Sequence, residues 1–168
     1  MKHHALQPEA AGQSPQTVGR MLNLLLADEF IIYVATRECH WNFTGMEFDS
    51  PPELFEEQYR QLEEWTELLA ERARQMNTWA EGGWSELIKT ARLSPRSGTN
   101  LSAGEMIDGV IELHEAMLGQ LRRDAGTCLQ VWRDTGTADF LTVLLLKHGK
   151  AARQLRVVRE NLQGVAAR

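Results

Sequence analysis

The stretch CHWNFTGMEFDSPPELFEEQY, residues 39–59, joins two segments that the sequence predicts to be helices. The segment before it, VGRMLNLLLADEFIIYVATRECHW, contains no proline and is too long for a strand. Within the stretch, Ser50-Pro51-Pro52-Glu53 is typical of a helix start, with a serine cap, a proline at the first helical position and a glutamate two positions later. The stretch therefore places His40 at the end of one helix and Glu56 just inside the next. This pattern fits either a metal site or a well-capped helix hairpin.

Three further helices follow from apolar spacing and caps. Apolar positions recur every three or four residues in three segments, which is the period of a buried helix face. Ser14 with Pro15 predicts the start of the first helix, Ser102 with Glu105 forms a second capping box, and Thr137 is expected to cap the last helix. Residues 77–101 are expected to form a long crossover in which WSELIKTARL is a short helix. The fold class predicted is all-α, a four-helix bundle. The predicted stripes are Phe55, Tyr59, Leu62, Thr66, Leu69, Ala73 and Met76; Met106, Val110, Leu113, Met117 and Leu121; and Leu141, Leu144, His148, Ala151, Leu155, Val158 and Leu162.

Composition narrows the class of protein. A chain of 168 residues fits one domain, and we expect a flexible tail at 1–13 followed by a bundle domain at 14–168. The formal net charge of -5 argues against a general phosphate-binding surface. Two cysteines give no disulfide framework, no apolar run is long enough to cross a bilayer, and the first residues lack the apolar stretch of a signal peptide. These features predict a soluble, cytoplasmic protein.

The acidic pair Glu67 and Glu71 lies four residues apart, so both carboxylates face one side of the second helix. Such a pair either bridges a hard cation or is simply solvated, and Arg72 and Arg74 are nearby salt-bridge partners. His40 has a similar alternative, because a histidine at a helix end interacts favourably with the helix dipole. Taken singly, these residues favour the solvated interpretation.

A metal centre inside one bundle is not expected, because the sequence has no Glu-x-x-His pair of the intramolecular di-iron kind. Glu112 and Glu115 flank His114 at a spacing that cannot direct all three to one metal, so we expect His114 to be a core histidine, like His148 on its apolar stripe. Glu56 and Glu67 share a helix face but lie about 16 Å apart along the axis. If these two acids cooperate, Glu56 must meet Glu67 and Glu71 of a second copy across a two-fold axis.

As a set, HWNFTGMEF, ELFEEQY, LLAERAR and DTGTADFLTVLLLKHGK resemble the Dps family (DNA-binding protein from starved cells), the mini-ferritins. The resemblance runs from about Leu22 to Leu162. It implies a ferritin-like bundle with a short helix in the crossover, assembled as a hollow dodecamer. It also implies a ferroxidase centre at the two-fold interface, where a pair of Fe(II) ions is oxidised by peroxide or oxygen before ferric iron is stored.

By motif, the resemblance implies that His40 and Glu56 of one subunit bind iron together with Glu67 and Glu71 of the facing subunit. Pro52 departs from the family, which commonly has a second histidine there, and Gly149 stands where the family tends to have glutamate. Asp134 and Asp139 resemble acids that line the family's iron-entry pores; read alone, they are turn and cap residues. Cys39 is interpreted as buried rather than as a ligand.

Two alternatives to a ferroxidase stay open. One is a structural, nucleoid-associated shell whose metal site is weakened at Pro52, and the other is a shell that binds a different divalent metal. The N-terminal stretch contains only Lys2 as a charged cation, so DNA binding is expected to be weak or absent at neutral pH. The apolar residues expected to hold the two-fold contact are Trp41, Met46, Leu54 and Phe55.

Overall fold

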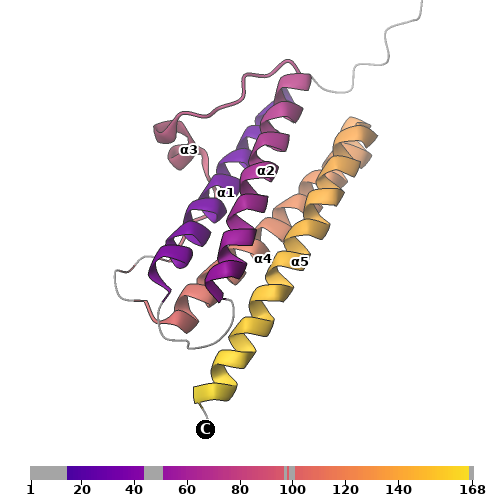
Figure 1. The fold of residues 1–168 in the computed structure, drawn as a ribbon. Helices are drawn as coiled ribbons and strands as arrows, with labels where there is room; N and C mark the ends of the chain where they lie inside the picture. The colour runs from indigo at the N-terminus through magenta and orange to yellow at the C-terminus, as the bar shows by residue number, and fades with distance from the viewer. Residues whose placement is uncertain (1–14, 44–50, 97, 99–100, 167–168) are drawn as a thin grey trace, which may run out of the picture.

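Two antiparallel helix pairs make up the bundle in the computed structural model, which describes residues 15–43, 51–96, 98 and 101–166 (Figure 1). The first pair is α1 (Pro15–Asn42) with α2 (Pro51–Gln75), and the second is α4 (Ala103–Thr127) with α5 (Thr135–Ala166). The short helix α3 (Trp84–Thr90) lies in the crossover and packs on the outside of α1. The predicted four-helix bundle with a helix in the crossover is confirmed. Among the described residues, no helix combines the length and the apolar character that spanning a bilayer requires.

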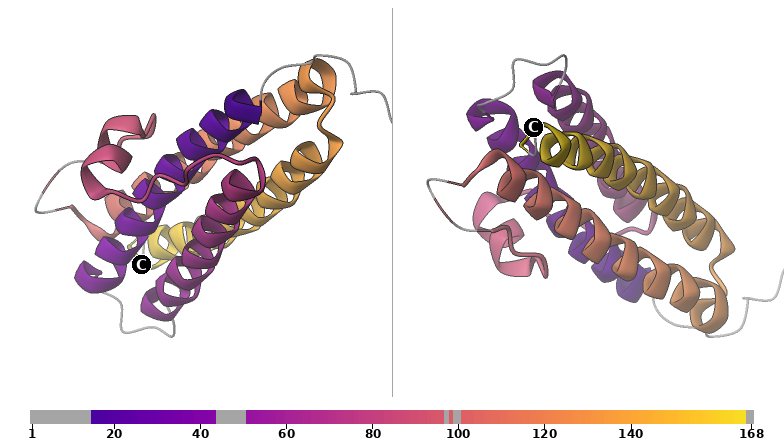
Figure 2. Two further views of the ribbon diagram at one scale, coloured as in Figure 1. Left: turned by 90° about the horizontal axis from the view of Figure 1, so that it is seen from above. Right: turned by 90° about the horizontal axis from the view of Figure 1, so that it is seen from below.

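The crossover runs the length of the bundle, so that α2 and α4 are parallel while each pair is internally antiparallel (Figures 1 and 2). Asp28 of α1 holds it in place, because its carboxylate is fully buried and accepts hydrogen bonds from the backbone N–H groups of Arg92 and Leu93. The Arg92 guanidinium binds the same carboxylate, with Nη2 at 2.7 Å from Oδ2. A buried acid with this many donors is well compensated for its lost hydration.

The predicted apolar stripes face the core. Leu62, Leu69, Met117, Leu141 and Leu155 are all fully buried. Burying one such side chain stabilises the fold by about 1.5–3 kcal/mol. The stripe of α2 is wider than predicted, because Trp65 and Gln58, one position off the stripe, are also buried.

Phe55 belongs to a second core cluster inside the subunit, and this corrects one expectation. It is only 1% exposed and packs with Cys39, Ile107 and Leu155. The interpretation of Phe55 as an intersubunit contact was therefore wrong, because nothing is left of its surface for a neighbour to bury. Trp41 is 66% exposed and stays available for such a contact, Leu54 is partly buried, and Met46 lies outside the described residues.

Two of the four predicted helix caps fall among the described residues, and one of these is confirmed. Ser102 and Glu105 form the predicted capping box at the start of α4. Ser14 and Ser50 lie outside the described residues, although α1 and α2 begin at the expected Pro15 and Pro51. The expected cap at Thr137 was wrong: Asp134 Oδ1 accepts from the Thr137 N–H at 2.9 Å, so Asp134 is the capping residue.

The end of α4 carries a feature that the sequence did not predict. Its last turn widens into a π-helix, η1 (Cys128–Trp132), and Arg133 then adopts a left-handed conformation with φ of 58°. Cys128, the first residue of this segment, lies seven residues after Leu121 on the same helical face and is fully buried. No glycine or asparagine marks this left-handed position, so the usual signal was missing.

Candidate metal centre

His40 lies in the last turn of α1, where the start of α2 orients its ring. Its Nδ1 is 3.0 Å from the carbonyl oxygen of Pro52. Because a carbonyl only accepts, Nδ1 must carry the hydrogen, and the lone pair of the neutral ring is then on Nε2. Tyr59 packs edge-on against the imidazole with ring centroids 5.4 Å apart. Pro52 supplies no ligand, but its carbonyl fixes the histidine tautomer that a metal ion requires.

Glu56 lies in the second turn of α2, four residues after Pro52. Its Oε1 is 2.5 Å from Nη2 of Arg60, one turn further along the helix. The side chains are 40% and 66% exposed respectively, so water screens this pair and the arginine can swing away. In the subunit alone, the Glu56 carboxylate is therefore already paired with a cation.

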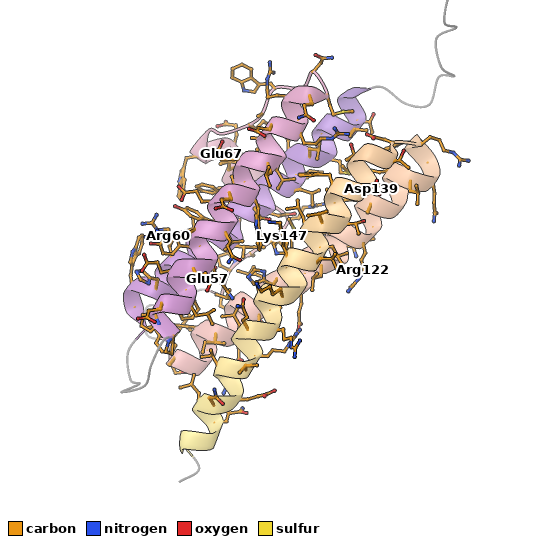
Figure 3. All side chains as sticks on the ribbon, turned by 45° about the vertical axis from the view of Figure 1, so that its right-hand side comes forward. Glu57, Arg60, Glu67, Arg122, Asp139 and Lys147 are labelled. Atoms are coloured by element: carbon orange, nitrogen blue, oxygen red, sulfur yellow. The ribbon has the colours of Figure 1, made fainter. Side chains whose placement is uncertain are left out.

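Glu67 and Glu71 are exposed on the same helix, further from His40. Figure 3 shows Glu67 and Arg60 at separate levels of α2. Because α2 is one continuous helix from Pro51 to Gln75, Glu56 and Glu67 are separated by about 16 Å along it. Within the described ranges, no three side chains of the His, Cys, Asp or Glu type come together in a way that could hold a metal ion. One chain thus keeps Glu67 and Glu71 apart from Glu56, and the contacts of His40 are with Pro52 and Tyr59 of α2.

Arg72 and Arg74 are not salt-bridge partners of that acidic pair, so this expectation was wrong. Arg72 reaches across to α5, where it donates to Thr137 Oγ1 and lies 3.5 Å from Asp134 Oδ1. Arg74 donates to the backbone carbonyl of Thr78. The carboxylates of Glu67 and Glu71 are therefore exposed without the arginines that the sequence placed beside them.

An aromatic cluster that the sequence analysis missed surrounds Arg37 beside this centre. The guanidinium carbon lies 5.6, 5.2 and 4.8 Å from the ring centroids of Tyr33, Trp41 and Tyr59. Arg37 also donates to the Tyr33 hydroxyl at 2.7 Å, and this hydrogen bond raises the pKa of the guanidinium above its ordinary value. The cluster positions Tyr59 and, through it, the ring of His40. Residues four apart on α1, Tyr33, Arg37 and Trp41, are the signal that could have revealed it.

The acids that resemble pore-lining residues lie at the start of α5. Asp134 caps this helix and Asp139 is exposed on it, so the pore interpretation stays a prediction. Burial raises the pKa of the Cys39 thiol to about 12, so this side chain is an unreactive core group, as expected.

His114 and His148 are fully buried, which confirms them as core histidines. Glu112 and Glu115, which flank His114 in sequence, face solvent and pair with Arg96 and Arg156.

Comparison with known proteins agrees with this architecture. The model of the ferritin-like domain family matches residues 20–165. An uncharacterized low temperature-induced protein of Nostoc sp. is 34% identical over 141 residues, covering 84% of this chain and 79% of the relative. A DNA protection during starvation protein of Agrobacterium fabrum is 25% identical over 142 residues, covering 84% of this chain and 87% of the relative.

Among solved structures, Dps from Thermosynechococcus elongatus superposes with a TM-score of 0.80 at 28% identity, covering 85% of this chain and 90% of that one. The family match and this structural likeness each cover most of the chain. The chain therefore belongs to the Dps family of ferritin-like proteins.

Proposed function

We propose that the protein is a mini-ferritin that binds Fe(II) at a site shared by two subunits, oxidises it, and stores ferric iron in a closed shell. Each site takes His40 and Glu56 from one subunit and Glu67 and Glu71 from its two-fold neighbour. In this role the shell protects the cytoplasm from the oxidative damage that free Fe(II) causes. Iron is the substrate here, held by oxygen and nitrogen ligands of the kind that ferrous ions accept.

The observation that carries this proposal is the division of the ligand set along α2. His40 presents Nε2 at one end of the subunit, held by the Pro52 carbonyl. On a single uninterrupted helix, the exposed carboxylates of Glu67 and Glu71 lie about three and four turns beyond Glu56. His40 with Glu56 forms one half of a site, and Glu67 with Glu71 forms the other. In a two-fold contact with an antiparallel copy, each half of one subunit meets the other half of its neighbour, so that two complete sites form.

The residues have distinct roles in this proposal. Glu67 and Glu71 supply two negative charges that attract the divalent ion and are better compensated as the ion becomes trivalent. Glu56 must exchange Arg60 for iron, so Arg60 competes with the substrate. His40 fixes one coordination position through Nε2, and Tyr59 limits the rotation of its ring.

Several large apolar side chains are exposed, which favours contact with a neighbouring subunit. Leu68, which follows Glu67 on α2, is 39% exposed, and Trp41, one residue after His40, is 66% exposed. Trp79 and Trp84, before and at the start of α3, are 77% and 59% exposed. Large apolar side chains left in water are typical of a subunit interface. The closed dodecamer is our proposal for the assembly.

A second candidate function is a shell that does not oxidise iron, and the Glu56–Arg60 pair together with Pro52 favours it. The centre has one imidazole, and one of its acids is already paired in the subunit. Such a shell would act by association with the nucleoid, although the formal charge of -5 predicts weak DNA binding at neutral pH.

The experiment that separates these functions is Fe(II) oxidation with added peroxide or with oxygen alone. We expect the purified protein to oxidise Fe(II) much faster than buffer, and the double variant Glu67→Ala/Glu71→Ala to lose most of that rate, on the order of 100-fold. The matched control is Glu86→Ala/Glu160→Ala, which removes the same charge from exposed sites on α3 and α5 and is expected to keep the wild-type rate. Equal rates for wild type, double variant and buffer would leave the structural shell as the function.

A further inference from the structure

A polar layer crosses the apolar core of the bundle, and it has no part in the proposed iron chemistry. Each of the four long helices contributes one residue: Glu29 from α1, Trp65 from α2, His114 from α4 and His148 from α5. The two histidines and the glutamate are 0% exposed, and Trp65 is 2% exposed. Ionisable side chains are almost never this deeply buried unless they are paired.

The three ionisable groups form one hydrogen-bonded chain with His148 in the middle. His148 Nε2 lies 3.1 Å from Glu29 Oε2, and its Nδ1 lies 2.9 Å from Nδ1 of His114. Within the described part of the chain, the two outer atoms, Glu29 Oε1 and His114 Nε2, have no hydrogen-bond partner. The two ligating sides of His148 point to different neighbours, so a single metal ion cannot take all three groups, in agreement with the absence of a metal cluster among the described residues.

The facing nitrogens limit how many protons the layer can hold. Two Nδ1 atoms 2.9 Å apart share one hydrogen, because two N–H groups cannot point at each other at that distance. If the hydrogen belongs to His114, both rings are neutral. If it belongs to His148, that ring is a cation beside Glu29, and His114 is neutral. A second positive charge needs a hydrogen on both Nδ1 atoms and breaks the contact.

Among the described residues, the hydrogen-bond and ring contacts of these three groups include no negative charge besides Glu29. Glu29 is the acid from α1, and α2 presents the indole of Trp65, whose ring centroid is 4.9 Å from that of His148. The Lys147 ammonium lies on this indole, 5.5 Å from its centroid, and its positive charge adds to the cost of charging the histidines. Figure 3 shows Lys147 on α5 at the side that faces α2.

We propose that the hydrogen-bonded Glu29–His148–His114 chain is a buried proton-binding site that makes the stability of the subunit depend on pH. It stabilises the packing of the four helices while it carries at most one positive charge. Mild acid adds a second positive charge and destabilises this packing. The ligand of this site is the proton. The consequence is a bundle that loses stability at a pH well above that at which surface carboxylates protonate.

The pKa of His114 decides whether the stability of the subunit rises or falls with acid. Burial, and then repulsion from His148, hold the pKa of His114 well below its ordinary value in the folded subunit. The unfolded chain therefore takes up this proton first, at the ordinary value of about 6.5. Stability that is fully present above that pH declines as the pH falls toward the lower folded value.

The test is the pH dependence of thermal unfolding, measured by circular dichroism from about pH 7.5 to about pH 5.5, above the range in which ordinary carboxylates protonate. For wild type we expect the folding equilibrium constant to fall about tenfold across this interval, which corresponds to a midpoint roughly 3–6 °C lower. In His114→Gln, whose amide bonds to His148 without titrating, this loss should disappear. The matched control, Gln120→Asn, changes a side chain elsewhere on α4 without removing a histidine and should keep the wild-type slope.

Glu29→Gln provides a second variant should His114→Gln fail to fold. Without the Glu29 carboxylate, even a single positive charge on the two histidines is unfavourable. The thermal unfolding midpoint of Glu29→Gln should therefore fall more steeply with acid than that of wild type. A flat wild-type midpoint over the interval, an unchanged slope in His114→Gln, or a slope in Glu29→Gln no steeper than that of wild type would each overturn the proposal.

Discussion

The buried layer at Glu29 and the exposed centre at His40 contain the same chemical groups, carboxylate and imidazole, but the groups have different roles. In the layer, four helices of one chain bring every group together, and 0% exposure makes each contact strong. In the centre, α2 keeps the groups apart along its length, and Glu56 is satisfied by an exposed arginine. The difference teaches that polar groups which pair with one another inside the chain serve the fold, while those kept apart on its surface mark where another molecule is needed.

The largest expected effect comes from placing the same charged side chain at a buried aromatic residue and at an exposed one. Phe55→Glu places a charge where 1% of the side chain is exposed, and we expect a loss of more than about 4 kcal/mol and no folded subunit. Trp41→Glu changes a side chain that is 66% exposed, so the subunit should stay helical while the particle mass falls. Circular dichroism and light scattering separate the two outcomes, and a Trp41→Glu particle of wild-type mass would remove Trp41 from the interface.

The next effect compares one buried and one exposed glutamate. Glu29→Gln should lower the free energy of unfolding at neutral pH by about 2 kcal/mol, because it weakens a charge-assisted hydrogen bond in a dry layer. Glu56→Gln should leave it unchanged within error, since water replaces the contact with Arg60. Urea unfolding of the two variants measures the contrast, and equal losses would mean that the layer is not special to the fold.

Much of this arrangement was predictable from sequence, and the failures have physical causes. The stripes and capping boxes that fix the helices are local, so residues such as Leu62 and Ser102 were placed correctly. Glu29 was missed because its burial depends on His148, 119 residues away, and nothing local distinguishes it from a surface acid. Phe55 was misplaced because periodicity shows that a residue is apolar and faces inward, not which surface covers it. Local sequence patterns cannot show how the candidate ligands meet, since that requires a second chain.

The smallest expected effect concerns the competitor at the metal centre. Arg60→Ala removes the cation that holds Glu56, so half-maximal oxidation should need about two- to fivefold less Fe(II), with an unchanged maximal rate. Arg153→Ala, which removes an exposed arginine from α5, is the control. If Arg60→Ala needs more Fe(II) than wild type, Arg60 assists the centre instead of competing with iron.

The most direct test of a site shared by two subunits is to mix two inactive variants. His40→Ala/Glu56→Ala lacks one half of each site, and Glu67→Ala/Glu71→Ala lacks the other. When equal amounts are unfolded and reassembled together, about half of the two-fold contacts should pair unlike subunits, and each such contact contains one intact site. The account predicts that Fe(II) oxidation recovers to about a quarter of the wild-type rate, while each variant reassembled alone stays inactive. Mixed particles that stay as inactive as the separate variants would contradict it, because that result places all four ligands in one chain.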